Sequence, residues 1–79
     1  MSEASSLRAR EPMTDREAFM RILVNLGHEP RLYDNNNPVR SGSRLADGHT
    51  IVGVDTRWSG MEIEFNAEGK AVDFEIYYE

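Results

Sequence analysis

The chain has 79 residues, no cysteine and a formal net charge of −5 at pH 7. A chain of this size makes one small domain whose core only just outweighs chain entropy. Without cysteine, neither disulfides nor a thiolate metal site can support the fold, which suits a reducing cytoplasm. The negative charge excludes a general nucleic-acid binder or a protein of anionic membrane surfaces, and no segment approaches the ~20 apolar residues of a membrane span.

The charge is unevenly distributed along the chain. Residues 1–44 contain seven Arg and six acidic residues, a net of +1, whereas residues 45–79 contain eight acidic residues against one Arg and one Lys, a net of −6. The acidity therefore belongs to the C-terminal half.

The first residues have the composition of an untethered segment. They mix Ser, Ala, Glu and Arg without periodicity and end at Pro12. We expect residues 1–13 to be a flexible leader and residues 14–79 to form a single α+β domain.

A helix is predicted over residues 15–26. Thr14 and Glu17 have the spacing of a capping box, in which each side chain accepts from the other residue's backbone amide. Gly27 is placed to end the helix in the left-handed conformation, and Pro30 blocks its extension. The apolar stripe of this helix, which should pack on the sheet, is Phe19, Ile22, Leu23 and Leu26.

Residues 28–49 are predicted to form a long loop, because they are rich in Asn, Pro, Gly, Ser and Arg. A loop of this length in a small domain is uncommon and is usually functional or mobile. A short extra strand or helical turn around residues 31–34 is an open alternative.

From Thr50 onward the hydrophobic period changes to two, which predicts strands with one buried face. The sequence thus favours one N-terminal helix packed on a three-stranded antiparallel β-meander. The residues of the buried face are Val52 and Val54, then Met61, Ile63 and Phe65, then Val72, Phe74, Ile76 and Tyr78.

The loops between the strands set the predicted register. Four-residue loops at 57–60 and 66–69, the latter with Gly69 left-handed, pair apolar residues with apolar residues. A three-residue loop after Phe65 would instead set Glu64 opposite Val72, and we reject it for that reason.

This register brings carboxylates together on the face that does not meet the helix. Asp55, Glu62 and Asp73 become lateral neighbours in one row, with Glu64 and Glu75 beside it. Directly opposed like charges are destabilising, so something should offset them.

Four interpretations of this acidic face remain open. It is a solvated surface that discourages edge association, or it is covered by the loop arginines Arg31, Arg40 and Arg44. Alternatively it docks a basic protein or peptide, or it holds Mg²⁺ or Ca²⁺ weakly, since a flat sheet offers no carbonyl cage.

Aromatic and histidine side chains add candidates. The ring of Trp58, in a predicted turn, either folds back over the end of the helix, which we favour, or stays exposed as an interface residue. Tyr77 should project from the acidic face, and Tyr33 lies in the long loop. His28 and His49 lack ligand spacing and are expected to be ordinary loop residues.

No nucleophile elbow, phosphate loop or metal signature is present in the sequence. The expectation is a protein that is not an enzyme and uses no cofactor or metal.

The chain closes on a hairpin, FNAEGKAVDFEIYYE. A capped helix followed by a meander ending in such a hairpin resembles small uncharacterised proteins of tailed bacteriophages and mobile elements, over about residues 13–79. The resemblance implies an intracellular accessory protein that binds a host or viral protein, and it implies no site residues.

The function favoured by the sequence is a small acidic protein-binding module that docks a basic protein surface through its sheet face. The alternatives are a DNA mimic that inhibits a nucleic-acid-binding protein, a virion structural component and a weak divalent-cation binder. The candidate partner-binding residues are Asp55, Glu62, Glu64, Asp73, Glu75, Tyr77 and Trp58.

Overall fold

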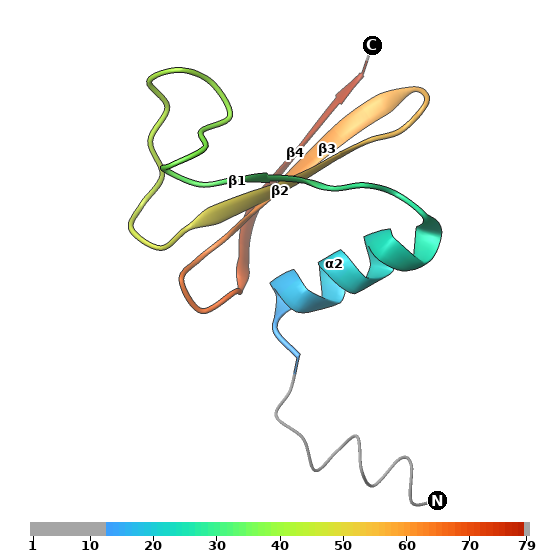
Figure 1. Ribbon diagram of the computed structural model, residues 1–79, viewed down its shortest axis with the longest axis horizontal. Helices are drawn as coiled ribbons and strands as arrows, with labels where there is room; N and C mark the ends of the chain where they lie inside the picture. Colours follow the sequence, from blue (N-terminus) through green and yellow to red (C-terminus); the bar gives the residue numbers. More distant parts are fainter. Residues whose placement is uncertain (1–12, 79) are drawn as a thin grey trace, which may run out of the picture.

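The computed structural model describes residues 13–78. One helix and one sheet of four antiparallel strands make up this part of the chain, with the strands in the order β1-β2-β3-β4 and the helix against one face of the sheet (Figure 1). The α+β class is therefore as predicted, whereas the sheet has four strands rather than three. The elements are α2 (Asp15–Leu26), β1 (Arg31–Tyr33), β2 (Thr50–Asp55), β3 (Ser59–Phe65) and β4 (Ala71–Tyr78).

The described part begins at the expected helix, so the predicted leader lies outside it apart from Met13. No helix between residues 13 and 78 combines the length and the apolar character needed to cross a bilayer.

Both ends of α2 are capped as predicted. The Thr14 hydroxyl accepts from the Glu17 amide at 3.1 Å, and the Glu17 carboxylate accepts from the Thr14 amide at 3.0 Å. Gly27 has φ 84°, and the amides of Gly27 and His28 donate to the last free carbonyls of the helix. These two hydrogen bonds form a Schellman motif. A residue that tolerates positive φ, such as glycine, closes this motif most easily.

The start of the helix is also tied to the β3–β4 turn. The Arg16 amide donates to the Gly69 carbonyl at 2.9 Å, and the Ala71 amide donates to the Asp15 carboxylate at 2.9 Å. These two bonds hold α2 beside the hairpin turn and so set where the helix crosses the sheet.

The additional strand is β1, which lies within the segment predicted as a long loop. Its residues pair with Ile51, Val52 and Gly53 of β2. Pro30 precedes the strand directly, and the Asp34 carboxylate accepts from the amides of two asparagines that follow it, which turns the chain. A three-residue segment is too short for its hydrophobic pattern to distinguish a strand from a turn, so the sequence left both possible for residues 31–34.

The buried core is small. Among residues 13–78, four apolar side chains are buried, namely Leu23, Val52, Val54 and Phe65, and four partly buried ones pack against them, namely Phe19, Met20, Met61 and Ile63. These residues come from α2, β2 and β3, so the core lies under the middle of the sheet.

The predicted packing of the helix is wrong at two positions. Ile22 and Leu26 are 53% and 67% exposed, whereas Leu23 is buried with Phe19 and Met20 on either side of it. Phe19, Met20 and Leu23 are neighbours on one side of the helix, and this side meets the sheet, so Ile22 and Leu26 lie beside the contact and not in it. A helix is also about 10 Å wide, while four strands spaced about 4.8 Å apart span more than that, so one helix leaves part of the sheet uncovered.

The uncovered part of the sheet is β4, where the sequence pattern predicted buried residues. All eight of its residues are exposed. The apolar side chains left open on this strand are Val72, Phe74, Ile76 and Tyr78.

The register between the strands differs from the predicted one by two residues. Asp55 faces Gly60 rather than Glu62, because a tight turn at Arg57 and Trp58 joins β2 to β3, with the Thr56 amide donating to the Ser59 carbonyl at 2.7 Å. Glu62 faces Glu75 rather than Asp73. The predicted row of Asp55, Glu62 and Asp73 therefore does not exist.

The loop of the second hairpin has three residues, so the predicted four-residue loop at 66–69 is wrong. Asn66 and Lys70 close it, and Gly69 has φ 82° as predicted. A bulge then corrects the register, since Phe65 faces Ala71 and Glu64 faces Asp73, which leaves Val72 unpaired. One extra residue returns the charged side chains to the face away from the helix.

Candidate functional site

The face of the sheet opposite α2, called the outer face below, carries most of the charged side chains of the strands. The paired residues form three lateral rows. The first is Tyr33, Ile51, Glu64 and Asp73; the second is Arg31, Gly53, Glu62 and Glu75; the third is Asp55, Gly60 and Tyr77.

Arg31 of β1 joins the second and third rows. Its guanidinium donates to Asp55 at 3.0 Å, to the Tyr77 hydroxyl at 3.1 Å and to the Tyr33 hydroxyl at 2.9 Å, and it lies 4.0 Å from the Glu62 carboxylate. The Tyr77 hydroxyl donates in turn to Glu62 at 3.2 Å. Arg31 thus supplies a positive charge to the carboxylates of the outer face, as the interpretation with covering arginines expected for this residue.

These contacts keep Arg31 charged. The hydrogen bond that Arg31 donates to the Tyr77 hydroxyl raises the pKa of Arg31 above its ordinary value, with further contributions from Tyr33 and Asp55, and desolvation only partly opposes them. Arg31 therefore stays a cation, and its role in the network is to donate hydrogen bonds and not to transfer a proton.

Two glycines make room for this network. A Cβ on Gly53 would lie 3.1 Å from the Arg31 guanidinium, and a Cβ on Gly60 would clash with the Tyr77 ring. Each glycine sits in a strand at an outward position, so a long side chain from a neighbouring strand can lie flat across it. This is how Arg31 and Tyr77 reach carboxylates that are not their direct partners.

The Tyr77 hydroxyl should contribute measurably to stability. We expect Tyr77→Phe to lower the free energy of unfolding by about 1 kcal/mol, because the hydroxyl bonds to both Arg31 and Glu62. Tyr78→Phe is the matched control, since that ring is 79% exposed. Urea unfolding of the two variants checks this, and equal midpoints would show that the network adds nothing.

Glu64 has a separate partner. The His49 Nδ1 atom lies 2.7 Å from the Glu64 carboxylate, and both side chains are partly buried. His49 thus pairs with an acid of the outer face, which its place in a loop did not indicate. Three of the five predicted carboxylates, Asp55, Glu62 and Glu64, are therefore engaged within the chain.

Asp73 and Glu75 of β4 differ from the other three. Within residues 13–78 neither carboxylate has a cationic side chain within 4.0 Å, and both residues are exposed. The carboxylates of the outer face that remain available to another molecule are therefore those of the edge strand.

The other loop arginines do not take part. Arg40 and Arg44 are exposed, and neither makes an ion pair with the described carboxylates. The loop itself lies against the outer face, where a hollow of about 180 Å³ is lined by Val39, Leu45 and Glu62, among others.

Trp58 lies at the far end of the sheet from the β3–β4 turn. Its ring is 73% exposed, and the Arg57 guanidinium lies 5.7 Å from the ring centre. The favoured prediction that this ring closes the core is wrong, because a tight turn points the side chain outward. Trp58 precedes Ser59, which pairs with Tyr78 of β4, and it remains a candidate contact residue.

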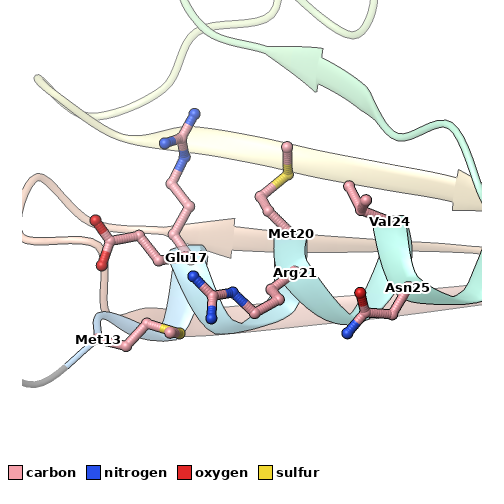
Figure 2. Close-up of a pocket in the computed structure, with 7 residues that line it drawn as sticks. Met13, Glu17, Met20, Arg21, Val24 and Asn25 are labelled. Carbon is pink, nitrogen blue, oxygen red and sulfur yellow. The ribbon is translucent and has the colours of Figure 1, made fainter. Parts of the chain in front are cut away.

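The helix carries an open hollow of its own, of about 890 Å³. Figure 2 shows Met20 pointing toward a strand, whereas Arg21 and Asn25 point away from it. The charged side chains that line it are Arg16, Glu17 and Arg21. This set does not contain a nucleophilic side chain next to a base. Among residues 13–78, no three His, Asp or Glu side chains are grouped to hold a metal ion, which gives the cation-binding alternative no support.

The structural role of Arg31 was the main feature that sequence reasoning left open. The usable signal was a glycine at an outward position in each of two adjacent strands, Gly53 in β2 and Gly60 in β3. A missing side chain on a charged face leaves room for a side chain that crosses from a neighbouring strand.

Comparison of the chain with protein-family models, curated proteins and solved structures found no match.

Proposed function

We propose that the chain is a non-enzymatic binding module that docks a basic protein surface through the β4 side of its outer face. Asp73, Glu75 and Tyr77 form the contact, with Trp58 at one end. The observation that carries the proposal is a contrast within the acidic face. Among residues 13–78, Asp55, Glu62 and Glu64 each have a cationic side chain or histidine within 4.0 Å, while Asp73 and Glu75 have none; the Asp73 carboxylate accepts instead from the backbone amide of Phe74 at 2.9 Å.

This arrangement fits a docking surface better than a DNA mimic. A phosphate mimic needs a free array of carboxylates, and Arg31 and His49 engage three of the five. Free charges beside an exposed apolar row fit a protein partner, since steering comes from the charge and affinity from apolar burial. A phage or mobile-element accessory protein of the cytoplasm remains our proposal for the setting, and it rests on the resemblance alone.

Capture from a bacterial lysate with matched baits tests the proposal. The test variant is Asp73→Lys/Glu75→Lys, and the control is Glu29→Lys/Asp47→Lys, which makes the same change of net charge at exposed residues outside β4. We expect basic proteins to bind the wild type and the control but not the β4 variant, and to elute as ionic strength rises above about 0.15 M.

Retention of the same proteins by the β4 variant would contradict the proposal. Circular dichroism of all three baits shows whether loss of binding comes from loss of folding. Because Asp73 and Glu75 are exposed, we expect the three spectra to match.

A further inference from the structure

The two edges of the sheet differ in how open they are. β1 has three residues, follows Pro30 and continues into a turn closed by Asp34. β4 has eight residues, contains neither Pro nor Lys and has strand β3 on one side only. Short length and proline are ordinary ways to block an edge strand, and β4 lacks both.

β4 also leaves both of its side-chain faces open. Asp73, Glu75 and Tyr77 project from the outer face, and Phe74 and Ile76 project on the helix side, where they are 63% and 46% exposed. An added strand would meet carboxylates on one face, an apolar row on the other and, between them, a backbone edge that pairs with no other strand among residues 13–78. The Phe74 amide donates to the Asp73 carboxylate at 2.9 Å, and an added strand would replace this bond.

From these features we infer that the partner binds as a fifth strand, antiparallel to β4, through an extended segment that alternates basic and apolar residues. This inference rests on the proposed function and specifies its mode. Backbone hydrogen bonds along the edge supply affinity, and the alternating side chains supply specificity. Lysine or arginine on the outer face meets Asp73 and Glu75, while apolar residues on the helix side cover Phe74 and Ile76.

Charge argues against a second copy of the chain in this place. In an antiparallel pair of β4 strands centred on Phe74, Asp73 of each copy would face Glu75 of the other. Like charges directly opposite are destabilising, and neither carboxylate has a counter-charge within residues 13–78. A basic strand removes this repulsion and turns it into attraction.

The probe for the experiment is the peptide Lys-Val-Lys-Val-Lys-Val-Lys, with Glu-Val-Glu-Val-Glu-Val-Glu as its control. Two further versions carry N-methyl groups on the backbone nitrogens of either the lysines or the valines. In an added strand only alternate amides face the neighbouring strand, so methylation of one set removes the pairing and methylation of the other set leaves it.

We expect the lysine peptide to bind and the glutamate peptide not to bind. One N-methyl version should lose about tenfold or more in Kd while the other stays within about twofold of the parent. The Asp73→Lys/Glu75→Lys variant should lose the lysine peptide as well.

Each contrary result identifies what fails. If both N-methyl versions bind like the parent while binding still depends on Asp73 and Glu75, strand addition is wrong and the docking proposal survives. If the lysine peptide does not bind, or binds the β4 variant equally well, both are wrong. If light scattering shows a dimer that the β4 variant abolishes, the occupant is a second copy and the inference is overturned.

Discussion

Replacing Phe65 by alanine should remove a large share of the free energy of unfolding, whereas the same change at Phe74 should leave it almost unchanged. Both rings project from the helix side of adjacent strands. Phe65 is 1% exposed and Phe74 is 63% exposed. The chemistry of the two substitutions is identical, so the difference in their effects measures how far the core extends across the sheet.

The expected magnitudes follow from burial. Removing a buried phenylalanine side chain costs about 3–5 kcal/mol, and a domain of this size has a total stability of about 3–10 kcal/mol. Phe65 also packs against Phe19 of the helix, with ring centres 6.2 Å apart. Its loss therefore weakens the interface between α2 and the sheet as well. At Phe74 the loss should be below about 1 kcal/mol.

Urea unfolding followed by circular dichroism distinguishes the two variants. Phe74→Ala should also weaken binding of the lysine peptide, because this ring lies where the apolar side chains of an added strand would pack. A Phe74→Ala protein that unfolds as readily as Phe65→Ala would contradict the description of β4 as lying outside the core.

The second large effect is expected at Arg31. Replacing Arg31 by methionine removes the cation that Asp55, Tyr33 and Tyr77 bond to, and it leaves Glu62 facing Glu75 with no nearby positive charge. We expect a loss of about 1–3 kcal/mol. The value stays well below that for a fully buried pair, because the side chain of Asp55 is 65% exposed.

Arg44→Met is the control for Arg31→Met, since it removes the same charge from an exposed side chain without an ion pair among the described residues. Part of the Arg31→Met loss should be recovered as ionic strength rises, because salt screens the carboxylates that are left unpaired. The same variant should bind the lysine peptide more tightly than the wild type. Equal unfolding midpoints for the two variants would show that Arg31 is not structural.

The local structure of α2 could be predicted because its signals lie within a few residues of one another. The Thr14–Glu17 capping box and Gly27 act on their own helix, and neither depends on the rest of the fold. The strand segments were predictable for the same reason, since alternation is a local property of the backbone.

The register was not predictable from alternation alone. A shift of one residue exposes the core and is easily rejected, but a shift of two returns every side chain to its own face. Asp55 opposite Glu62 and Asp55 opposite Gly60 therefore satisfy the same hydrophobic pattern. The bulge at Val72 added to the difficulty, because it permits a three-residue loop that a regular ladder would forbid.

The extent of the core depended on the width of the sheet. Four apolar residues in the predicted stripe of α2 indicate a buried helix face, but they do not show how many strands it covers. Because α2 packs on β2 and β3 through Phe19, Met20 and Leu23, Ile22 and Leu26 lie beside the contact and stay exposed. The apolar row of β4 lies beyond the reach of the helix and stays exposed as well. Those open positions give the docking proposal its surface.

Hydrogen exchange of the β4 amides tests the central claim, that the open edge of β4 is where a basic partner docks. In the free protein, the amides of residues 71–78 that face away from β3 should exchange rapidly, apart from that of Phe74, which donates to the Asp73 carboxylate at 2.9 Å. In the presence of the lysine peptide those alternate amides should become protected, with no comparable change along α2. Protection confined to α2 or to the Arg57–Trp58 turn, with unchanged exchange across β4, would contradict the claim.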